Sequence, residues 1–140
     1  MFEVATQVPL VPTRTTPPRC AIYGRSATAD HEAVVDQERV CEAWLSHHLG
    51  ADVAASARRY VDVGVSGLDL ERPSLRRLLA DIEAGMFDIV IVGRVDRVSR
   101  SPRDLAFVLG HLANARTALI SVKEGVILAP SLDAVETDDA

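Results

Sequence analysis

The chain has 140 residues, of which 48% are hydrophobic and 25% are charged, as is ordinary for one globular domain with its own core. A net charge of −5 argues against a grip on nucleic acid through the whole surface. No apolar run approaches the ~20 residues of a membrane span, so no membrane partner is expected. The start lacks a secretory signal pattern, and the chain has two cysteines, so we expect a cytoplasmic protein with both thiols reduced.

Residues 1–18 are rich in proline and threonine and are expected to form a disordered leader. A short apolar strand is predicted at residues 20–23, and a small polar loop follows it over residues 24–28. Asp30 is a candidate N-cap for the next helix, which the apolar spacing places over residues 31–48.

A second strand is predicted near residues 58–61. The glycine-punctuated loop after it, residues 62–67, suits a close approach of backbone to another group. A helix then opens at Arg72-Pro73, because proline is favoured in the first turn, and Gly85 ends it.

The most informative stretch is residues 88–103. Its apolar start predicts a strand over residues 88–92, buried on both faces. Side chains at the carboxyl end of such a strand converge on the crevice where α/β sheets bind ligands. A guanidinium matches phosphate oxygens, so the stretch favours a phosphodiester ligand, although a solvated, salt-bridged connection has the same composition. The charged residues that follow the strand are Arg94, Asp96, Arg97, Arg100 and Arg103.

The rest of the chain predicts a helix over residues 101–115, a strand over 117–122 and a short fifth strand over 126–128. Because strands and helices alternate, the predicted fold is α/β, with a mostly parallel four- or five-stranded sheet flanked by helices. The domain is expected to span residues 19–128, and an acidic, disordered tail is expected over residues 129–140.

Four short motifs stand in the order and spacing of one protein family. They are Tyr23-Gly-Arg25, Asp62-x-Gly64-x-Ser66-Gly67, Glu71-Arg72-Pro73-x-Leu75 and Asp88-(x)7-Asp96-Arg97-x-Ser99-Arg100. Through these motifs, residues 19–124 resemble the catalytic domain of the serine recombinases, the resolvase–invertase family. The resemblance implies a resolvase-like fold and site-specific DNA recombination and integration. In that reaction a serine hydroxyl attacks the phosphodiester, and a 5′-phosphoserine link and a free 3′-hydroxyl form before resealing within a tetramer.

The resemblance also assigns roles to residues, without a metal or another cofactor. Arg25, Arg72, Arg97 and Arg100 would stabilise the charge of the phosphoryl transition state, with Asp96 orienting an arginine or aiding proton transfer. Tyr23, Gln37 and Asp88 would support the site, and Arg94 and Arg103 are candidate DNA contacts. The four histidines show no metal-ligand spacing with the cysteines.

One departure from the family concerns the nucleophile, which the family places four residues after the tyrosine. That position is Ala27, and Ser26 lies one residue early. In an extended strand a shift of one residue turns a side chain to the opposite face. Three alternatives remain: Ser26 acts after a rearrangement, Thr28 acts, or the chain has no nucleophile.

A second departure concerns the family's long helix and its DNA-binding module, neither of which the residues after Glu124 predict. Tight DNA binding and the family's dimer or tetramer are therefore in doubt. Two functions remain open: a serine recombinase, truncated or minimal, and an inactive resolvase-like domain that binds DNA or protein.

Overall fold

The computed structural model describes residues 16–64 and 72–130. The predicted leader and acidic tail lie almost entirely outside the described residues, as do Ser66, Gly67 and Glu71 of the motifs. Within the described part of the chain, no helix is long and apolar enough to cross a membrane.

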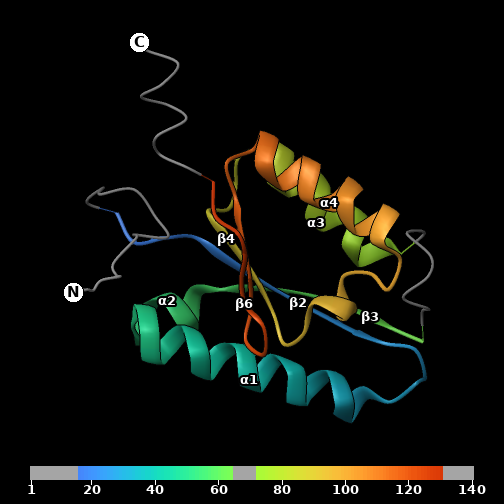
Figure 1. Cartoon of the computed structure of the whole chain (residues 1–140). Helices are drawn as coiled ribbons and strands as arrows, with labels where there is room; N and C mark the ends of the chain where they lie inside the picture. The colour runs from blue at the N-terminus through green and yellow to red at the C-terminus, as the bar shows by residue number, and fades with distance from the viewer. Residues whose placement is uncertain (1–15, 65–71, 131–140) are drawn as a thin grey trace.

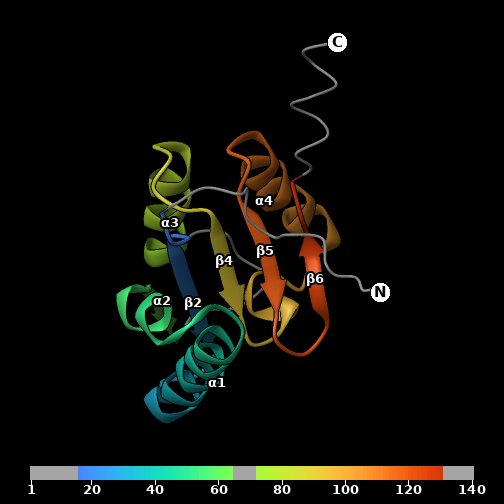
Figure 2. The same ribbon diagram turned by 90° about the vertical axis from the view of Figure 1, so that its left-hand side faces the viewer.

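A five-stranded sheet in the order β3-β2-β4-β5-β6 lies between two layers of helices, as Figures 1 and 2 show. All neighbouring strands are parallel except β5 and β6, so the predicted mostly parallel α/β fold is confirmed. The strands are β2 (Cys20–Ser26), β3 (Arg58–Val63), β4 (Ile89–Val92), β5 (Ala118–Ser121) and β6 (Gly125–Leu128). The helices are α1 (His31–Leu49), α2 (Ala51–Ser56), α3 (Pro73–Glu83), the 3₁₀ turn η1 (Val95–Arg97) and α4 (Pro102–Asn114).

The structure differs from the sequence predictions in three elements. Strand β2 continues to Ser26 instead of ending at Tyr23, because β3 pairs with it over this whole stretch. Helix α2 and the turn η1 were not predicted, since six and three residues are too short to show a helical period.

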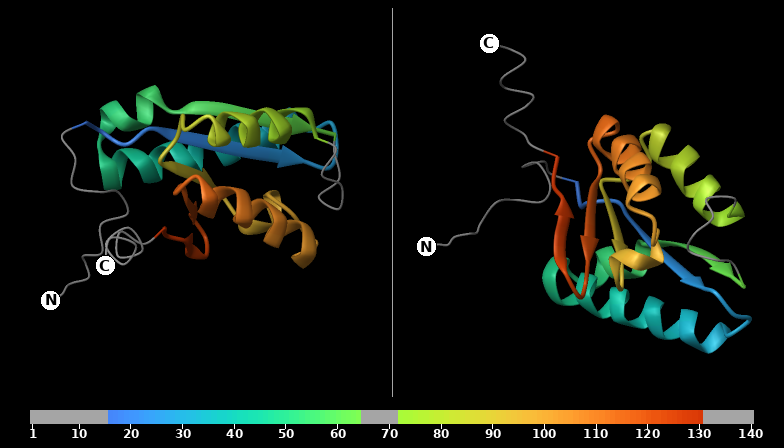
Figure 3. Two further views of the ribbon diagram at one scale, coloured as in Figure 1. Left: turned by 90° about the horizontal axis from the view of Figure 1, so that it is seen from above. Right: turned by 45° about the vertical axis from the view of Figure 1, so that its right-hand side comes forward.

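The side chains of each inner strand alternate between two cores. On β2, Ala21 and Tyr23 lie in the core under α3 and α4, whereas Cys20 and Ile22 lie in the core under α1 and α2. In the right-hand view of Figure 3, the two helix layers lie on opposite sides of the sheet. The alternation therefore decides which face each later residue of β2 presents.

The helix starts agree with the sequence. Asp30 accepts hydrogen bonds from the backbone N–H groups of Glu32 and Ala33 at 3.0 and 3.2 Å, which confirms it as the N-cap of α1. Ser101 caps α4 in the same way, with its hydroxyl 3.3 Å from the N–H of Asp104.

Replacing Ile91 with alanine should lower the free energy of unfolding by about 2–5 kcal/mol, because this fully buried side chain fills the centre of β4 and would leave a cavity. The control is Val126→Ala, which truncates a side chain that is 50% exposed and should change stability by less than about 0.5 kcal/mol. Urea denaturation followed by circular dichroism measures both. Equal losses would show that β4 does not carry the core.

Candidate functional site

Strand β2 reaches beyond its neighbour β4, and this extension begins the candidate site. The pairing of β2 with β4 ends at Ile22, so the following residues have β3 as their strand neighbour. Gln37 of α1 supplies partners on the other edge: its Oε1 accepts the Arg25 N–H at 3.0 Å, and its Nε2 donates to the Arg25 carbonyl at 2.9 Å. Gly24 permits this approach, since a Cβ there would lie 3.4 Å from Gln37 Oε1. A helix side chain thus fixes the backbone that carries Arg25.

Arg25 and Arg72 converge on one short piece of backbone after β4. Arg25 donates from Nε to the Arg97 carbonyl at 3.1 Å and from Nη2 to the Asp96 carbonyl at 3.0 Å. Arg72 donates from Nη1 to the Arg97 carbonyl at 3.0 Å and from Nη2 to the Val98 carbonyl. Both arginines are almost completely buried, at 2% and 0% exposure, so their guanidiniums fix the loop of η1.

Tyr23 and Asp62 form a hydrogen-bonded chain that ends at the Arg72 guanidinium. The Tyr23 hydroxyl donates to Asp62 Oδ2 at 2.8 Å and accepts from Arg72 Nη1 at 3.2 Å. Asp62 also accepts the backbone N–H groups of Ser74 and Leu75 at 2.9 and 3.0 Å, in the first turn of α3. The buried carboxylate therefore fixes the start of α3, where Arg72 is the N-cap residue, and compensates part of the buried positive charge.

The electrostatic effects reflect this crowding. Burial lowers the pKa of the Arg25 guanidinium, and the positive charges of Arg72, Arg97 and Arg100 lower it further. The four guanidiniums therefore influence one another at the carboxyl edge of the sheet. Burial also raises the pKa of Tyr23 far above its usual value, an effect that Arg72 opposes and Asp62 reinforces. Tyr23 thus remains a protonated hydrogen-bond donor at neutral pH.

The turn η1 leaves two polar atoms unmatched. Among the residues that the structure describes, the buried side-chain atoms without a hydrogen-bond partner are Asp96 Oδ1 and Arg97 Nε. The other oxygen of Asp96 accepts from Arg94 Nη2 at 2.9 Å. Such unmatched buried atoms are uncommon and costly, and they often mark a binding position. The remaining arginines of the stretch, Arg100 and Arg103, are exposed.

The Ser26 hydroxyl, one residue before the predicted nucleophile position, is bonded to Thr28. Ser26 is 5% exposed, and its Oγ donates to the Thr28 carbonyl at 2.8 Å and accepts the Thr28 N–H at 3.3 Å. By the alternation along β2, Ser26 belongs to the α1 face, opposite to Arg25. Ala27 is the first residue after β2, is exposed, and carries no hydroxyl.

A groove of about 410 Å³ adjoins η1 on its α1 side. Arg94, Arg97 and Lys123 supply positive charge along it, and Gln37 and Val40 of α1 line its other wall. Arg97 therefore lines this groove, and its carbonyl accepts hydrogen bonds from Arg25 and Arg72.

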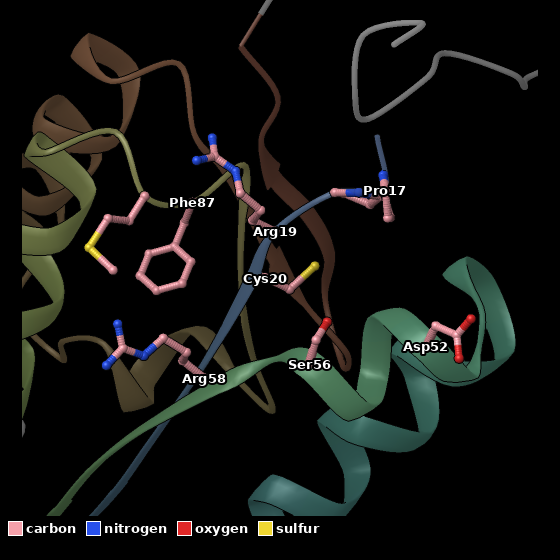
Figure 4. A pocket seen from close by; sticks show the side chains of 9 residues that line it. Pro17, Arg19, Cys20, Asp52, Ser56, Arg58 and Phe87 are labelled. Atoms are coloured by element: carbon pink, nitrogen blue, oxygen red, sulfur yellow. The ribbon is translucent and has the colours of Figure 1, made fainter. Parts of the chain in front are cut away.

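Asp88, predicted to support the site, lies at the opposite edge of the sheet, before β4 begins. It accepts from the backbone N–H and the Nη2 of Arg19 at 2.8 and 3.2 Å, so it holds the start of β2. A cavity of about 440 Å³ opens beside this pair, between Cys20, Arg58 and Phe87 (Figure 4). The cavity lies at the amino ends of the strands and contains none of the predicted catalytic residues.

Two residues of the site were not assigned individually from the sequence. Asp62 had a signal, because it opens the second motif, but its contacts with Tyr23 and α3 depend on the register between β2 and β3. Glu124, which accepts the Val95 N–H at 3.0 Å, gave no signal beyond its place after a strand. In the part of the chain that the structure describes, no group of three or more His, Cys, Asp or Glu residues could hold a metal ion.

Comparison with known proteins identifies the class. Residues 20–137 match the family model "Resolvase, N terminal domain". The N-terminal catalytic domain of TP901-1 integrase is 32% identical, with a TM-score of 0.65 over 76% of this chain and 79% of that one. A resolvase family site-specific recombinase from Streptococcus pneumoniae is 19% identical and has the same fold, with a TM-score of 0.65 over 86% of this chain and 82% of that one. No curated protein matches the sequence.

The C-terminal catalytic domain of ISC1926 TnpA, an IS607-like serine recombinase, also shares the fold, with 20% identity and a TM-score of 0.63 over 86% of this chain and 77% of that one. The chain belongs to the resolvase family. Its described residues form a domain of the serine recombinase type, which confirms the resemblance drawn from the four motifs.

Tyr23→Phe should lower the free energy of unfolding by about 1–3 kcal/mol, because it removes the hydroxyl that links two buried charged groups. Tyr60→Phe is the matched control: its hydroxyl bonds to Asp81, which water reaches in part, so the loss should be smaller. Guanidinium chloride unfolding at pH 7 compares the two variants. A larger loss from Tyr60→Phe would contradict the supporting role of Tyr23.

Proposed function

We propose that this domain acts on a DNA phosphodiester at the carboxyl edge of the sheet, in site-specific recombination of the serine type. The observation that carries the proposal is the pair of unmatched buried atoms on η1, Asp96 Oδ1 and Arg97 Nε. A phosphate placed there would accept from Arg97 Nε, and the attacking or leaving hydroxyl would donate to Asp96 Oδ1. A phosphodiester together with its attacking or leaving hydroxyl would thus supply partners for both atoms.

The roles in this proposal follow from burial. Arg97 and the exposed Arg100 contact the non-bridging oxygens of the phosphate, where charge develops in the transition state. Arg25 and Arg72 do not need to touch the substrate. Their guanidiniums hold the η1 backbone and add positive potential from within the protein, since both are nearly inaccessible to water. Asp96 holds or moves a proton at the attacking or leaving oxygen.

The first chemical step requires a hydroxyl that can reach phosphorus. Serine attack at phosphorus forms an O–P bond, breaks the bond to the 3′ oxygen and transfers one proton to that oxygen. The attacking oxygen must lie ~3–3.5 Å from phosphorus and in line with the leaving oxygen. Ser26 can do this only if its Oγ leaves the Thr28 carbonyl and turns to the Arg25 face.

The residues at the two candidate nucleophile positions, Ser26 and Ala27, favour a second candidate function. With alanine at the family's nucleophile position and the Ser26 hydroxyl bound to Thr28, the domain binds a DNA phosphate or a protein partner without cleaving DNA. Such a domain would act within an assembly in which other subunits supply the hydroxyl.

The partner of the recombinase is duplex DNA, and the partner of the inactive domain is DNA or a protein. The family's dimer or tetramer is expected where a dimer-forming helix is supplied. We expect the protein to act in the cytoplasm.

Burial raises the pKa of Cys20 to about 11 and that of Cys41 to about 12, so both thiols remain protonated and poorly reactive at neutral pH.

Ala27→Ser should create a covalent DNA adduct that the unmodified chain does not form, because position 27, four residues after Tyr23, is where the family carries its serine. The assay incubates each variant with nicked suicide DNA carrying a recombination site, with the dimer-forming helix and DNA-binding module fused to the chain. Denaturing gels and mass spectrometry then locate the phosphoserine.

Ser26→Ala is the matched control and should change nothing. An adduct on the unmodified chain that disappears with Ser26→Ala would make Ser26 the nucleophile. Absence of an adduct from every variant would favour the binding function over the recombinase.

The chain alone should bind duplex DNA weakly, with a dissociation constant on the order of 10⁻⁴–10⁻⁶ M at physiological salt, typical of phosphate contacts without sequence reading. Arg94→Ala and Arg103→Ala should each weaken binding and reduce its salt dependence, since both side chains are exposed beside η1 and α4. Arg39→Ala, on the exposed surface of α1, is the control. Fluorescence anisotropy from 50 to 200 mM salt measures this, and tight sequence-specific binding would contradict it.

A further inference from the structure

The turn between β5 and β6 continues the contact between β5 and β4 beyond the ends of both strands. The Val122 N–H donates to the Val92 carbonyl at 2.9 Å, and the Lys123 N–H donates to the Gly93 carbonyl at 3.1 Å. The next contact has the opposite direction and uses a side chain: the Val95 N–H donates to Glu124 Oε1 at 3.0 Å. Glu124 therefore binds the backbone at the point where the chain leaves β4 and enters η1.

The Glu124 carboxylate is itself held in place. The Ser121 hydroxyl donates to the same Oε1, and the Glu124 N–H donates to Ser121 Oγ at 3.0 Å. Ser121 is fully buried in β5, so it offers a fixed support. The hydrogen bonds from the Ser121 hydroxyl and the Val95 N–H lower the pKa of Glu124, which is therefore an anion at neutral pH.

The two ends of η1 are thus held by opposite charges. An anion accepts the N–H of its first residue, while the guanidiniums of Arg25 and Arg72 donate to the carbonyls at its far end. Both kinds of hydrogen bond are charge-assisted and stronger than neutral ones. The side chains between these clamps are Asp96 and Arg97, which carry the two unmatched atoms.

We propose that Glu124 is a positioning residue, which fixes the first residue of η1 and so aims Asp96 and Arg97 at the bound phosphate. The consequence for DNA rests on the proposed function, since Glu124 acts only through those two side chains. None of the four family motifs includes Glu124. The chemistry required is an acceptor for the Val95 N–H, so an uncharged isostere with an oxygen at the same place retains most of the effect.

The first arm of the test needs no DNA. In the full chain, Glu124→Ala should speed hydrogen exchange of the Val95 amide about tenfold and shift the Arg97 Nε resonance, as the loss of one net hydrogen bond predicts. Glu124→Gln should stay within about threefold of the wild type, because its Oε1 can still accept. Exchange at Leu119, buried in the centre of the sheet, should not change in either variant, which separates positioning from a general loss of stability.

Glu32→Ala is the matched control, since Glu32 is an exposed glutamate at the start of α1, distant in sequence from η1. Unchanged exchange at Val95 in Glu124→Ala would overturn the proposal, as would an equal change in the control or a change that extends to Leu119.

The second arm measures DNA affinity by fluorescence anisotropy. Glu124→Ala should bind about threefold to tenfold more weakly than the wild type, with Glu124→Gln and Glu32→Ala close to it. If the wild type fails to bind DNA, the proposed function fails, and the exchange at Val95 still decides whether Glu124 positions η1. If Glu124→Ala binds DNA as the wild type does although Val95 is released, the positioning role is refuted while the proposed function stands.

Discussion

The structure depends on the hydrogen bonds from two buried guanidiniums, those of Arg25 and Arg72, to the backbone carbonyls of residues 96–98. Burying two like charges side by side costs several kcal/mol each unless their donors are matched and a counter-charge is near. The carbonyls match the donors, and Asp62 supplies the negative charge through Tyr23. The length of β2, the start of α3 and the shape of the loop after β4 must all agree for this arrangement to form, so it ties the chemistry to the fold.

The same arrangement separates the four arginines of the predicted site into two pairs. The sequence suggests that all four contact a ligand, but the structure gives the two pairs different roles. Arg25 and Arg72 belong to the protein interior, whereas Arg97 and Arg100 remain available at the edge of the sheet. An acidic protein can therefore present a strongly positive local site, because the inner guanidiniums add potential where little water screens them. Lysine could not replace them, since it lacks the planar fork that binds two carbonyls.

The alternation of side chains along β2 determines which face the Ser26 hydroxyl occupies. Because β2 stays extended to Ser26, residues 23 and 25 share one face, and position 27 lies just beyond the end of the strand. Ser26 falls on the α1 face, where it closes the turn to Thr28. A hydroxyl one residue away from the family position is thus remote in function although adjacent in sequence. The family assignment and the missing hydroxyl are compatible, and the contrast makes position 27 the most informative site in the chain.

The sequence by itself determined the α/β class, the order of the long elements, the cap at Asp30, and the family through four spaced motifs. These features are local, since periodicity, capping and motif spacing are written in neighbouring residues. Only the tertiary structure decided that Asp88 lies at the far edge of the sheet with Arg19, that Asp62 holds Tyr23, and that Glu124 holds Val95. Those contacts join residues 29 to 69 positions apart. They depend on strand register and on which end of the sheet a residue occupies, and no local pattern records either.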